Sequence, residues 1–192
     1  MPPPWTRAAR AVDNGRMSPR ENRFWQPDVT VATVVVDRGR LLCVEERSNG
    51  RLVINQPAGH LEPDESLEHA ALRETREETG WDVRLTGFIG FYQWQAPVQA
   101  DGGAGRHYLR LAFAAEPERH DPARPLDDGI VRALWLTPAE LRAGRDRHRS
   151  PLVWQVVEDF LAGQRYPLSL LRSAPGGSAF DGFPAIPRDD AP

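Results

Sequence analysis

Cysteine, long apolar runs and excess charge are all scarce in the 192-residue chain. The single cysteine, Cys43 in the run LLCV, excludes a disulfide within the chain and favours a buried thiol in a reducing cytoplasm. No apolar run approaches the roughly 20 residues of a membrane helix, and no charged and then apolar leader opens the chain. The net charge of -3 gives no basic footprint for bulk binding of nucleic acid. These absences favour a cytoplasmic protein without membrane or nucleic-acid partners.

The two ends of the chain differ from its middle in composition. Residues 1–27 contain prolines and arginines without periodicity, and residues 173–192 are rich in Pro, Gly, Ala and Ser. Both segments are typical of poorly ordered tails, and Met17 is an alternative translation start to Met1. Hydrophobic residues make up 40% of the chain, which suffices for a core. We expect one domain over residues 28–172, without internal repeats.

Strand and helix patterns alternate along this domain. β-branched or alternating apolar runs predict strands at 29–36, 41–46, 87–95, 107–116 and 133–137. Apolar residues at helical spacing predict helices over 65–79, 137–141 and 150–163. The turn DRGR should fold the first two strands into a hairpin, and the segment PAGH should end the strand before the first helix. The pattern favours an α/β sandwich with a mixed β-sheet.

Particular residues mark the limits of the predicted helices. Asp64 or Ser66 can cap the start of the first helix, and Gly80 suits its C-terminal end. Ser150 can cap the last helix, with proline at the first helical position.

The first predicted helix carries three acids on one side. At about 100° per residue, Glu74, Glu77 and Glu78 fall within about 100° of one another. Glu78 lies nearly in line with Leu67, so the acids overlap the edge of the apolar face. Like charges at this spacing repel by roughly 0.2–0.5 kcal/mol each, and Arg73 alone cannot neutralise three acids. A divalent cation can, and oxygen ligands suit Mg²⁺ or Mn²⁺.

A plainer interpretation of the same acids is a solvated, salt-bridged helix face. Charge alone favours that interpretation, whereas the overlap with the apolar face favours a metal site. The preceding segment QPAGH turns the backbone tightly, so the carbonyl of Gly59 could supply another oxygen to an ion. Gly59 could equally be a plain turn residue.

Residues 59–81 resemble the signature of the Nudix hydrolases. That signature is a glycine, five residues, a glutamate, seven residues, Arg-Glu, an aliphatic residue, one residue, Glu-Glu, one residue, a glycine and a bulky apolar residue. The chain meets it with Gly59, Glu65, Arg73, Glu74, Glu77, Glu78, Gly80 and Trp81. Only Thr75 departs, at an aliphatic position that we interpret as a packing position.

The likeness extends over residues 28–168. The segments VTVATVVV, NQPAGHLE, QWQAP and GQRYPL are similar to the bacterial NudJ-type phosphatase branch of the family. This resemblance implies a Nudix-type α/β/α sandwich with a mixed β-sheet. It also implies hydrolysis of nucleoside di- and triphosphates and of hydroxymethylpyrimidine pyrophosphate, although the signature itself does not choose the substrate.

The resemblance also assigns roles to residues. Arg73 would orient Glu77, and Glu65 would join the same hydrogen-bond network. Bound Mg²⁺ or Mn²⁺ would bridge phosphate oxygens and activate the water that attacks phosphorus. The ligands would be the carbonyl of Gly59 and the carboxylates of Glu74, Glu77 and Glu78.

The general base and the substrate contacts stay open. Glu78 is one candidate base, and Asp127 and Asp128 are others, because family members often take this residue from a distant loop. Aromatic side chains could stack on a nucleobase or belong to the core, and arginines could reach phosphates or lie idle on the surface. The candidate substrate contacts are Trp94, Tyr92 and Arg110.

Two other functions fit the sequence. One is a pyrophosphohydrolase for a nucleotide sugar, a dinucleoside polyphosphate or an RNA 5′ end. The other is a non-catalytic Nudix module that senses a ligand, although the presence of every acid of the signature argues against it. Either a monomer or a homodimer is compatible with the sequence.

Overall fold

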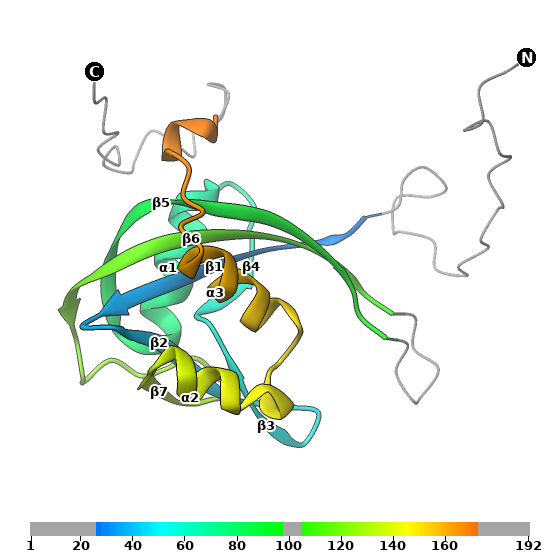
Figure 1. The fold of residues 1–192 in the computed structure, drawn as a ribbon, viewed down its shortest axis with the longest axis vertical. Helices are drawn as coiled ribbons and strands as arrows, with labels where there is room; N and C mark the ends of the chain where they lie inside the picture. The colour runs from blue at the N-terminus through cyan, green and yellow to red at the C-terminus, as the bar shows by residue number, and fades with distance from the viewer. Residues whose placement is uncertain (1–25, 98–104, 173–192) are drawn as a thin grey trace, which may run out of the picture.

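The computed structural model describes residues 26–97 and 105–172, which form one mixed β-sheet with helices around it (Figure 1). The strands are β1 (Asp28–Asp37), β2 (Arg40–Ser48), β3 (Arg51–Asn55), β4 (Ala58–His60), β5 (Trp81–Gln95), β6 (His107–His120) and β7 (Ile130–Leu136). The helices are α1 (Leu67–Thr79), α2 (Pro138–Ala143) and α3 (Leu152–Leu161), with short 3-10 turns η1 (Arg145–Arg147) and η2 (Leu168–Leu170). Within the described ranges, no helix has the length and apolar character to cross a membrane.

One central strand connects the whole sheet. The strand order is β3-β2-β1-β6-β5, with β4 added to β1 and β7 added to β2. β1 and β6 are parallel, and the remaining pairs are antiparallel. β1 pairs with β4 over Thr30–Ala32 and with β2 over Val36–Asp37. The start of β1 therefore lies beside β4, which leads into α1.

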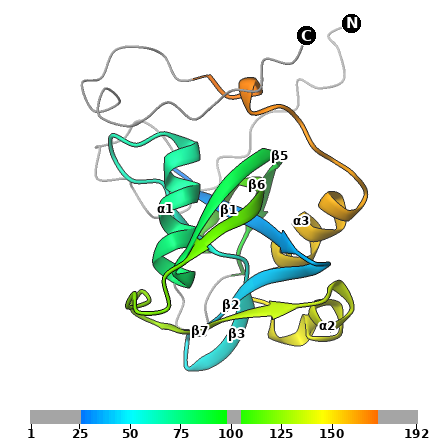
Figure 2. The same ribbon diagram turned by 90° about the vertical axis from the view of Figure 1, so that its left-hand side faces the viewer.

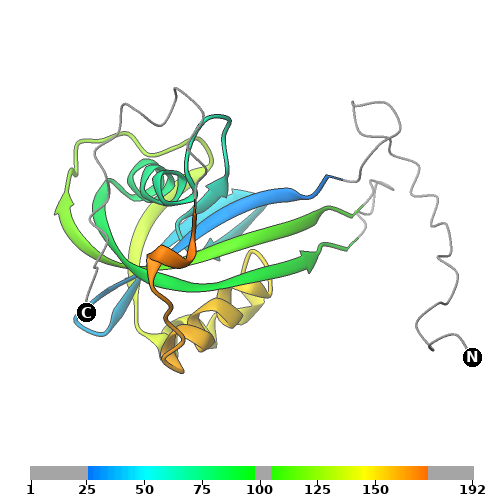
Figure 3. The ribbon, with the colours of Figure 1, turned by 90° about the horizontal axis from the view of Figure 1, so that it is seen from above.

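Helices cover both faces of the sheet. Figure 3 shows the sheet between α1 and α3, and Figure 2 places α2 near α3. Because side chains alternate along a strand, β1 turns Val31 and Val35 toward one core cluster and Val34 toward the other. The first cluster includes Ala70 and Ala71 of α1, and the second includes the apolar side of α3. The predicted α/β/α sandwich with a mixed sheet is confirmed.

Several local predictions are confirmed. The first two strands form the expected hairpin, in which Arg38 and Gly39 have φ angles of 47° and 75°. Positive φ at both central residues is the twist that a tight hairpin requires. Cys43 is buried, and burial raises its pKa to about 12. A thiol in this state stays protonated and unreactive at neutral pH.

Other elements differ from their predicted limits. β5 begins at Trp81 rather than at residue 87, and register shifts beside Gly87 and Gly90 break the alternation that the prediction relied on. The segment PAGH was expected only to end a strand, but Ala58–His60 pairs with β1 as β4. Ser150 was expected to cap α3, which was wrong, because its hydroxyl makes no hydrogen bond among the described residues. Most of the predicted tails lies outside the described residues.

Candidate active site

Helix α1 carries the acids, and both of its ends have residues that fix its limits. The Ser66 hydroxyl accepts a hydrogen bond from the His69 backbone N–H at 3.2 Å, so Ser66 rather than Asp64 is the cap. Gly80 has a φ of 71° and its N–H donates to the Arg76 carbonyl. The acids Glu74 and Glu78 are buried on the side of α1 that also buries its alanines, as the predicted overlap requires.

Arg73 holds three acids at once. Its guanidinium donates to both oxygens of Glu65 at 3.0 and 2.7 Å, to Glu74 at 2.8 Å and to Glu77 at 3.1 Å. These partners raise the pKa of Arg73, with the hydrogen bond to Glu65 as the largest cause. Burial opposes the ionised form of Glu65, but the hydrogen bonds from Arg73 and the Glu62 backbone lower the pKa of Glu65 overall. The predicted network of these residues is therefore present.

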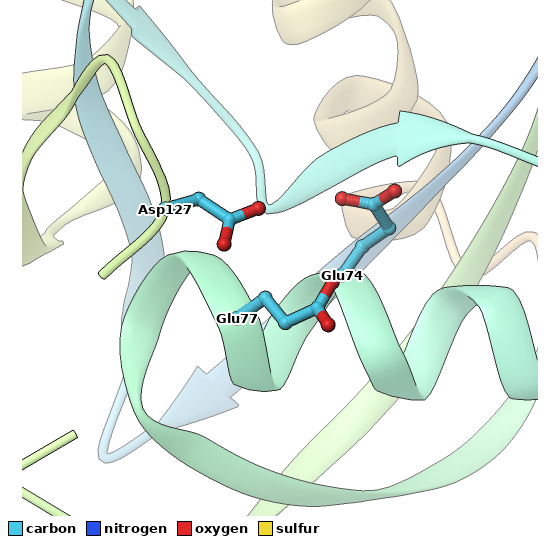
Figure 4. A group of neighbouring side chains, drawn as sticks. All are labelled: Glu74, Glu77 and Asp127. Atoms are coloured by element: carbon cyan, nitrogen blue, oxygen red, sulfur yellow. The ribbon is translucent and has the colours of Figure 1, made fainter. Parts of the chain in front are cut away.

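A third carboxylate joins two of the helix acids from a distant loop. Figure 4 shows Glu74 and Glu77 on α1, with Asp127 coming toward them from the loop before β7. One oxygen from each residue lies within 4.8 Å of the others. The Asp127 backbone N–H donates to the Glu77 carbonyl at 3.2 Å, which anchors the loop on the helix. Asp128 is exposed and does not belong to this group.

This cluster, which we call the acidic cluster (Glu74, Glu77 and Asp127), is electrostatically unfavourable by itself. Burial raises the pKa of Glu74, and the neighbouring charges of Glu77 and Asp127 add to the effect. Arg73 opposes the shift but is shared with Glu65. Three carboxylate oxygens at this spacing match the hard-oxygen donor set that Mg²⁺ and Mn²⁺ prefer.

Gly59 leaves the space that Glu74 fills. It lies on β4 opposite Val31, so the chain at this point is a paired strand rather than a free turn. A Cβ atom on Gly59 would lie 2.1 Å from the Glu74 Cδ. Glycine at this signature position is therefore needed to let the Glu74 carboxylate approach the backbone.

Glu78 faces the same region from the next turn of α1. Its Oε2 accepts a hydrogen bond from the Ala58 backbone N–H at 2.8 Å. Burial raises the pKa of Glu78 to about 9, and the charge of Glu74 adds to that shift. Glu78 is not in the acidic cluster, but both it and Glu74 line one large cavity.

The cavity has a volume of about 670 Å³, within the range of small-molecule sites. Trp94 and Arg110, both predicted to contact substrate, line it. Tyr92 does not, because it is buried in the core beside α3 and its hydroxyl donates to Asp159 at 2.8 Å. The cavity is lined by residues of β1 to β6, of α1 and of the start of α3 with the segment before it, among them Thr30, Asn55, Ala58, Gly59, Tyr108, Arg149 and Ser150.

Sequence reasoning missed several of these lining residues. Thr30 and Asn55 sit in ordinary strand patterns, which give no sign that they face a cavity. Ser150 was singled out by its place before the proline of the last helix, but that place predicts a helix cap and not a cavity residue. Only the folded chain brings these positions together.

Comparison with known proteins agrees with this geometry. A family described as NUDIX domain matches residues 25–155. The chain is 42% identical over 148 residues to Phosphatase NudJ of Escherichia coli strain K12, which covers 77% of this chain and 92% of that protein. It is 44% identical to a solved NUDIX hydrolase from Nitrosomonas europaea, with a TM-score of 0.72 over 79% of this chain and 100% of that one.

A more distant solved structure, described as UDP-X diphosphatase, shares the fold with a TM-score of 0.58 at 15% identity, over 77% of this chain and 69% of that one. The family match over residues 25–155 takes in every strand of the sheet, α1 and the acidic residues described above. The chain belongs to the Nudix hydrolase family and is an enzyme of the NudJ type.

Proposed function

We propose that the protein is a divalent-metal-dependent phosphatase of nucleoside di- and triphosphates and of hydroxymethylpyrimidine pyrophosphate. The proposal depends on one observation, the acidic cluster, whose oxygens lie within 4.8 Å of one another beside a cavity of about 670 Å³. We further propose that the catalytic domain spans residues 28–172 and acts in the cytoplasm as a monomer or homodimer.

The acidic cluster supports binding of Mg²⁺ or Mn²⁺, whose charge would neutralise its carboxylates. Glu74 and Glu77 share Arg73 with Glu65, and burial raises the pKa of Glu74 although Arg73 opposes that shift. The Gly59 position, cleared of a side chain, gives Glu74 its place next to the β4 backbone. We assign Glu74, Glu77, Asp127 and Glu78 as the side chains that hold the ion, with the carbonyl of Gly59 as a further oxygen. A bound ion of this kind binds phosphate oxygens and lowers the pKa of a water molecule.

The protein's own residues have distinct roles in this proposal. Arg73 keeps Glu74 and Glu77 in place through hydrogen bonds at 2.8 and 3.1 Å, with Glu65 fixing the far side of its guanidinium. Glu78, fixed at one oxygen by Ala58, would orient the attacking water and accept its proton once a bound cation offsets the burial that raises the pKa of Glu78.

Asp127 is the alternative base, and of the two loop aspartates it is favoured by its contact distance to the helix acids. Asp128 lies outside that group, although both aspartates are exposed. The products are inorganic phosphate and the shortened phosphate ester.

A substrate panel with and without EDTA tests the proposal. Phosphate release should require Mg²⁺ or Mn²⁺, and Glu77→Gln should lower it by at least about 100-fold, the upper limit for residues that only support a metal ligand. The fold should survive, because glutamine keeps the shape and removes a repulsive charge. Glu68→Gln, on the first turn of α1 and outside the acidic cluster, serves as the matched control. EDTA-resistant release, or unchanged turnover in Glu77→Gln, contradicts the proposal.

A further inference from the structure

Unpaired polar groups gather in a part of the cavity that the acidic cluster does not use. Thr30 Oγ1, Asn55 Oδ1, Ser150 Oγ and the Nε and Nη1 atoms of Arg110 are buried, yet have no hydrogen-bond partner within the described residues. All four residues line the cavity. Buried polar groups of folded proteins are nearly always hydrogen-bonded, so such a group of exceptions requires a partner that the chain does not supply.

The fold places these residues as two adjacent pairs. Thr30 on β1 and Arg110 on β6 are direct neighbours in the parallel strand pair. Asn55 ends β3, and the Arg149 N–H donates to the Ile54 carbonyl at 2.9 Å, which brings the segment containing Ser150 alongside. The charges that act on Arg110 include Glu46 and Arg149. Since Asn55 donates to Glu46 at 3.3 Å, the two pairs border one space, which we call the Arg110 subsite (Thr30, Asn55, Arg110 and Ser150).

Arg110 is the unusual member of this subsite. Only 8% of its surface is exposed, and no carboxylate forms a salt bridge with it among the described residues. Burial lowers its pKa to about 10, so it remains charged at neutral pH. A buried guanidinium that keeps its charge without a hydrogen-bonded partner needs an acceptor from the ligand.

The mixture of donors and acceptors indicates what kind of ligand fits. Arg110 can only donate, the Asn55 Oδ1 can only accept, and the two hydroxyls can do either. A phosphate group offers acceptors alone, so it would leave the Asn55 oxygen facing another acceptor. It would also approach the carboxylate of Glu46, which accepts the hydrogen bond from Asn55 and acts on Arg110. A neutral group with an acceptor beside an N–H donor satisfies all four residues.

An aromatic surface lies in the same cavity. The rings of Trp94 and Tyr108 are stacked with centroids 5.5 Å apart and planes at 17°. Both residues line the cavity, as does Arg110. A flat ring can extend such a stack, and its edge can then meet polar groups.

We propose that the Arg110 subsite recognises the organic end of the substrate as a flat nitrogen heterocycle, by an edge that carries a hydrogen-bond acceptor beside an N–H donor. This inference rests on the proposed function, because it assigns the part of the same substrate that the acidic cluster does not hold. Arg110 is then a specificity-determining residue rather than a contact to phosphate.

Steady-state kinetics with two substrates tests this assignment. Cytidine triphosphate carries a heterocycle, and inorganic tripolyphosphate carries none. Arg110→Met should raise the KM for cytidine triphosphate by at least about 10-fold, the loss expected for one buried charged hydrogen bond, and leave the KM for tripolyphosphate within about 2-fold. If the methionine variant does not fold, Arg110→Lys replaces it in the test, because lysine keeps the buried charge. This variant should also raise the KM for cytidine triphosphate. Arg119→Met, an exposed change on the same strand outside the cavity, is the matched control.

A binding experiment separates failure of this inference from failure of the proposed function. In EDTA, unphosphorylated cytidine should quench tryptophan fluorescence of the full-length protein, and Arg110→Met should weaken its binding at least about 10-fold. This outcome is independent of hydrolysis. Equal loss with both substrates would make Arg110 a phosphate contact, and no loss in either assay would leave it without a ligand role. Both results overturn the inference.

Discussion

The close contact between Gly59 and Glu74 gives a sharp test with a single added methyl group. In Gly59→Ala the new Cβ would lie 2.1 Å from the Glu74 Cδ. Carbon atoms in contact are about 3.5–4.0 Å apart, so the carboxylate must move by about 1.5 Å or more. The Gly59 backbone is not left-handed, so alanine can adopt it, and the perturbation falls on Glu74 rather than on the chain.

The size of the expected effect follows from how little displacement of its ligands Mg²⁺ tolerates. Oxygen ligands of Mg²⁺ lie at about 2.0–2.1 Å with little freedom, so a carboxylate displaced by about 1.5 Å no longer binds. A misplacement of about 1 Å costs roughly 100-fold in rate, equivalent to about 2.7 kcal/mol. Losing the Arg73–Glu74 hydrogen bond costs about 1.5–3 kcal/mol of unfolding free energy, which the reduced entropy of the unfolded chain offsets by about 0.4–1 kcal/mol.

Phosphate release and thermal unfolding measure these two effects separately. We expect kcat/KM to fall by about 100-fold or more, while the unfolding free energy falls by only about 0.5–2.6 kcal/mol. Gly144→Ala is the matched control, because a Cβ there meets only ordinary contacts of 3.6 Å and beyond. Shortening the acid in Gly59→Ala/Glu74→Asp should recover part of the loss and so give non-additive effects. Wild-type kcat/KM in Gly59→Ala would refute the reasoning.

Three further predictions concern other residues. Asp127→Asn should lower phosphate release by at least about 10-fold and Asp128→Asn by less than about 2-fold, because only Asp127 lies with the helix acids; equal effects would contradict this difference. Arg73→Gln should lower the unfolding free energy in EDTA by about 3–5 kcal/mol, measured by urea unfolding, whereas the exposed Arg76→Gln should cost less than about 1 kcal/mol. Burial lowers the pKa of His148, so the native state binds its proton more weakly than the unfolded chain does. Stability should therefore decline as the pH falls through about 6.5, and His148→Gln should remove that part of the decline in melting curves between about pH 7.5 and 5.5.

The helix acids could be found from the sequence because helical periodicity is local. Glu74 and Glu78 share a side of α1 with buried alanines, and counting residues along the chain is enough to show it. The limits of α1 were also accessible, since serine caps and a glycine stop act within one turn. The same local reasoning could not choose between Asp64 and Ser66, because both spacings permit a cap.

Local sequence patterns could not single out Asp127. Its place beside Glu77 depends on a loop that closes across the sheet, and a backbone hydrogen bond of 3.2 Å fixes that closure. Two adjacent loop aspartates have no periodicity that could separate one from the other. Ser150 fails for a related reason, since its sequence context matches a helix cap while the tertiary fold turns it toward the cavity.

The predicted limits of a strand were wrong where its pairing with the neighbouring strand is irregular. β5 continues from Trp81 through register shifts near Gly87, and each shift changes which side chains face the core. An alternation rule therefore detects only the last part of this strand. The pairing of Gly59 with β1 was missed because three residues are too few to show a strand pattern.

Calorimetric titration of Mn²⁺ into the full chain, with a methylene-bridged nucleoside diphosphate present, tests the central claim most directly. The account predicts saturable uptake of the ion, weakened at least about 100-fold when Glu74, Glu77 and Asp127 are all changed to their amides. Absence of uptake at millimolar Mn²⁺, or the same affinity in the triple variant, would contradict it.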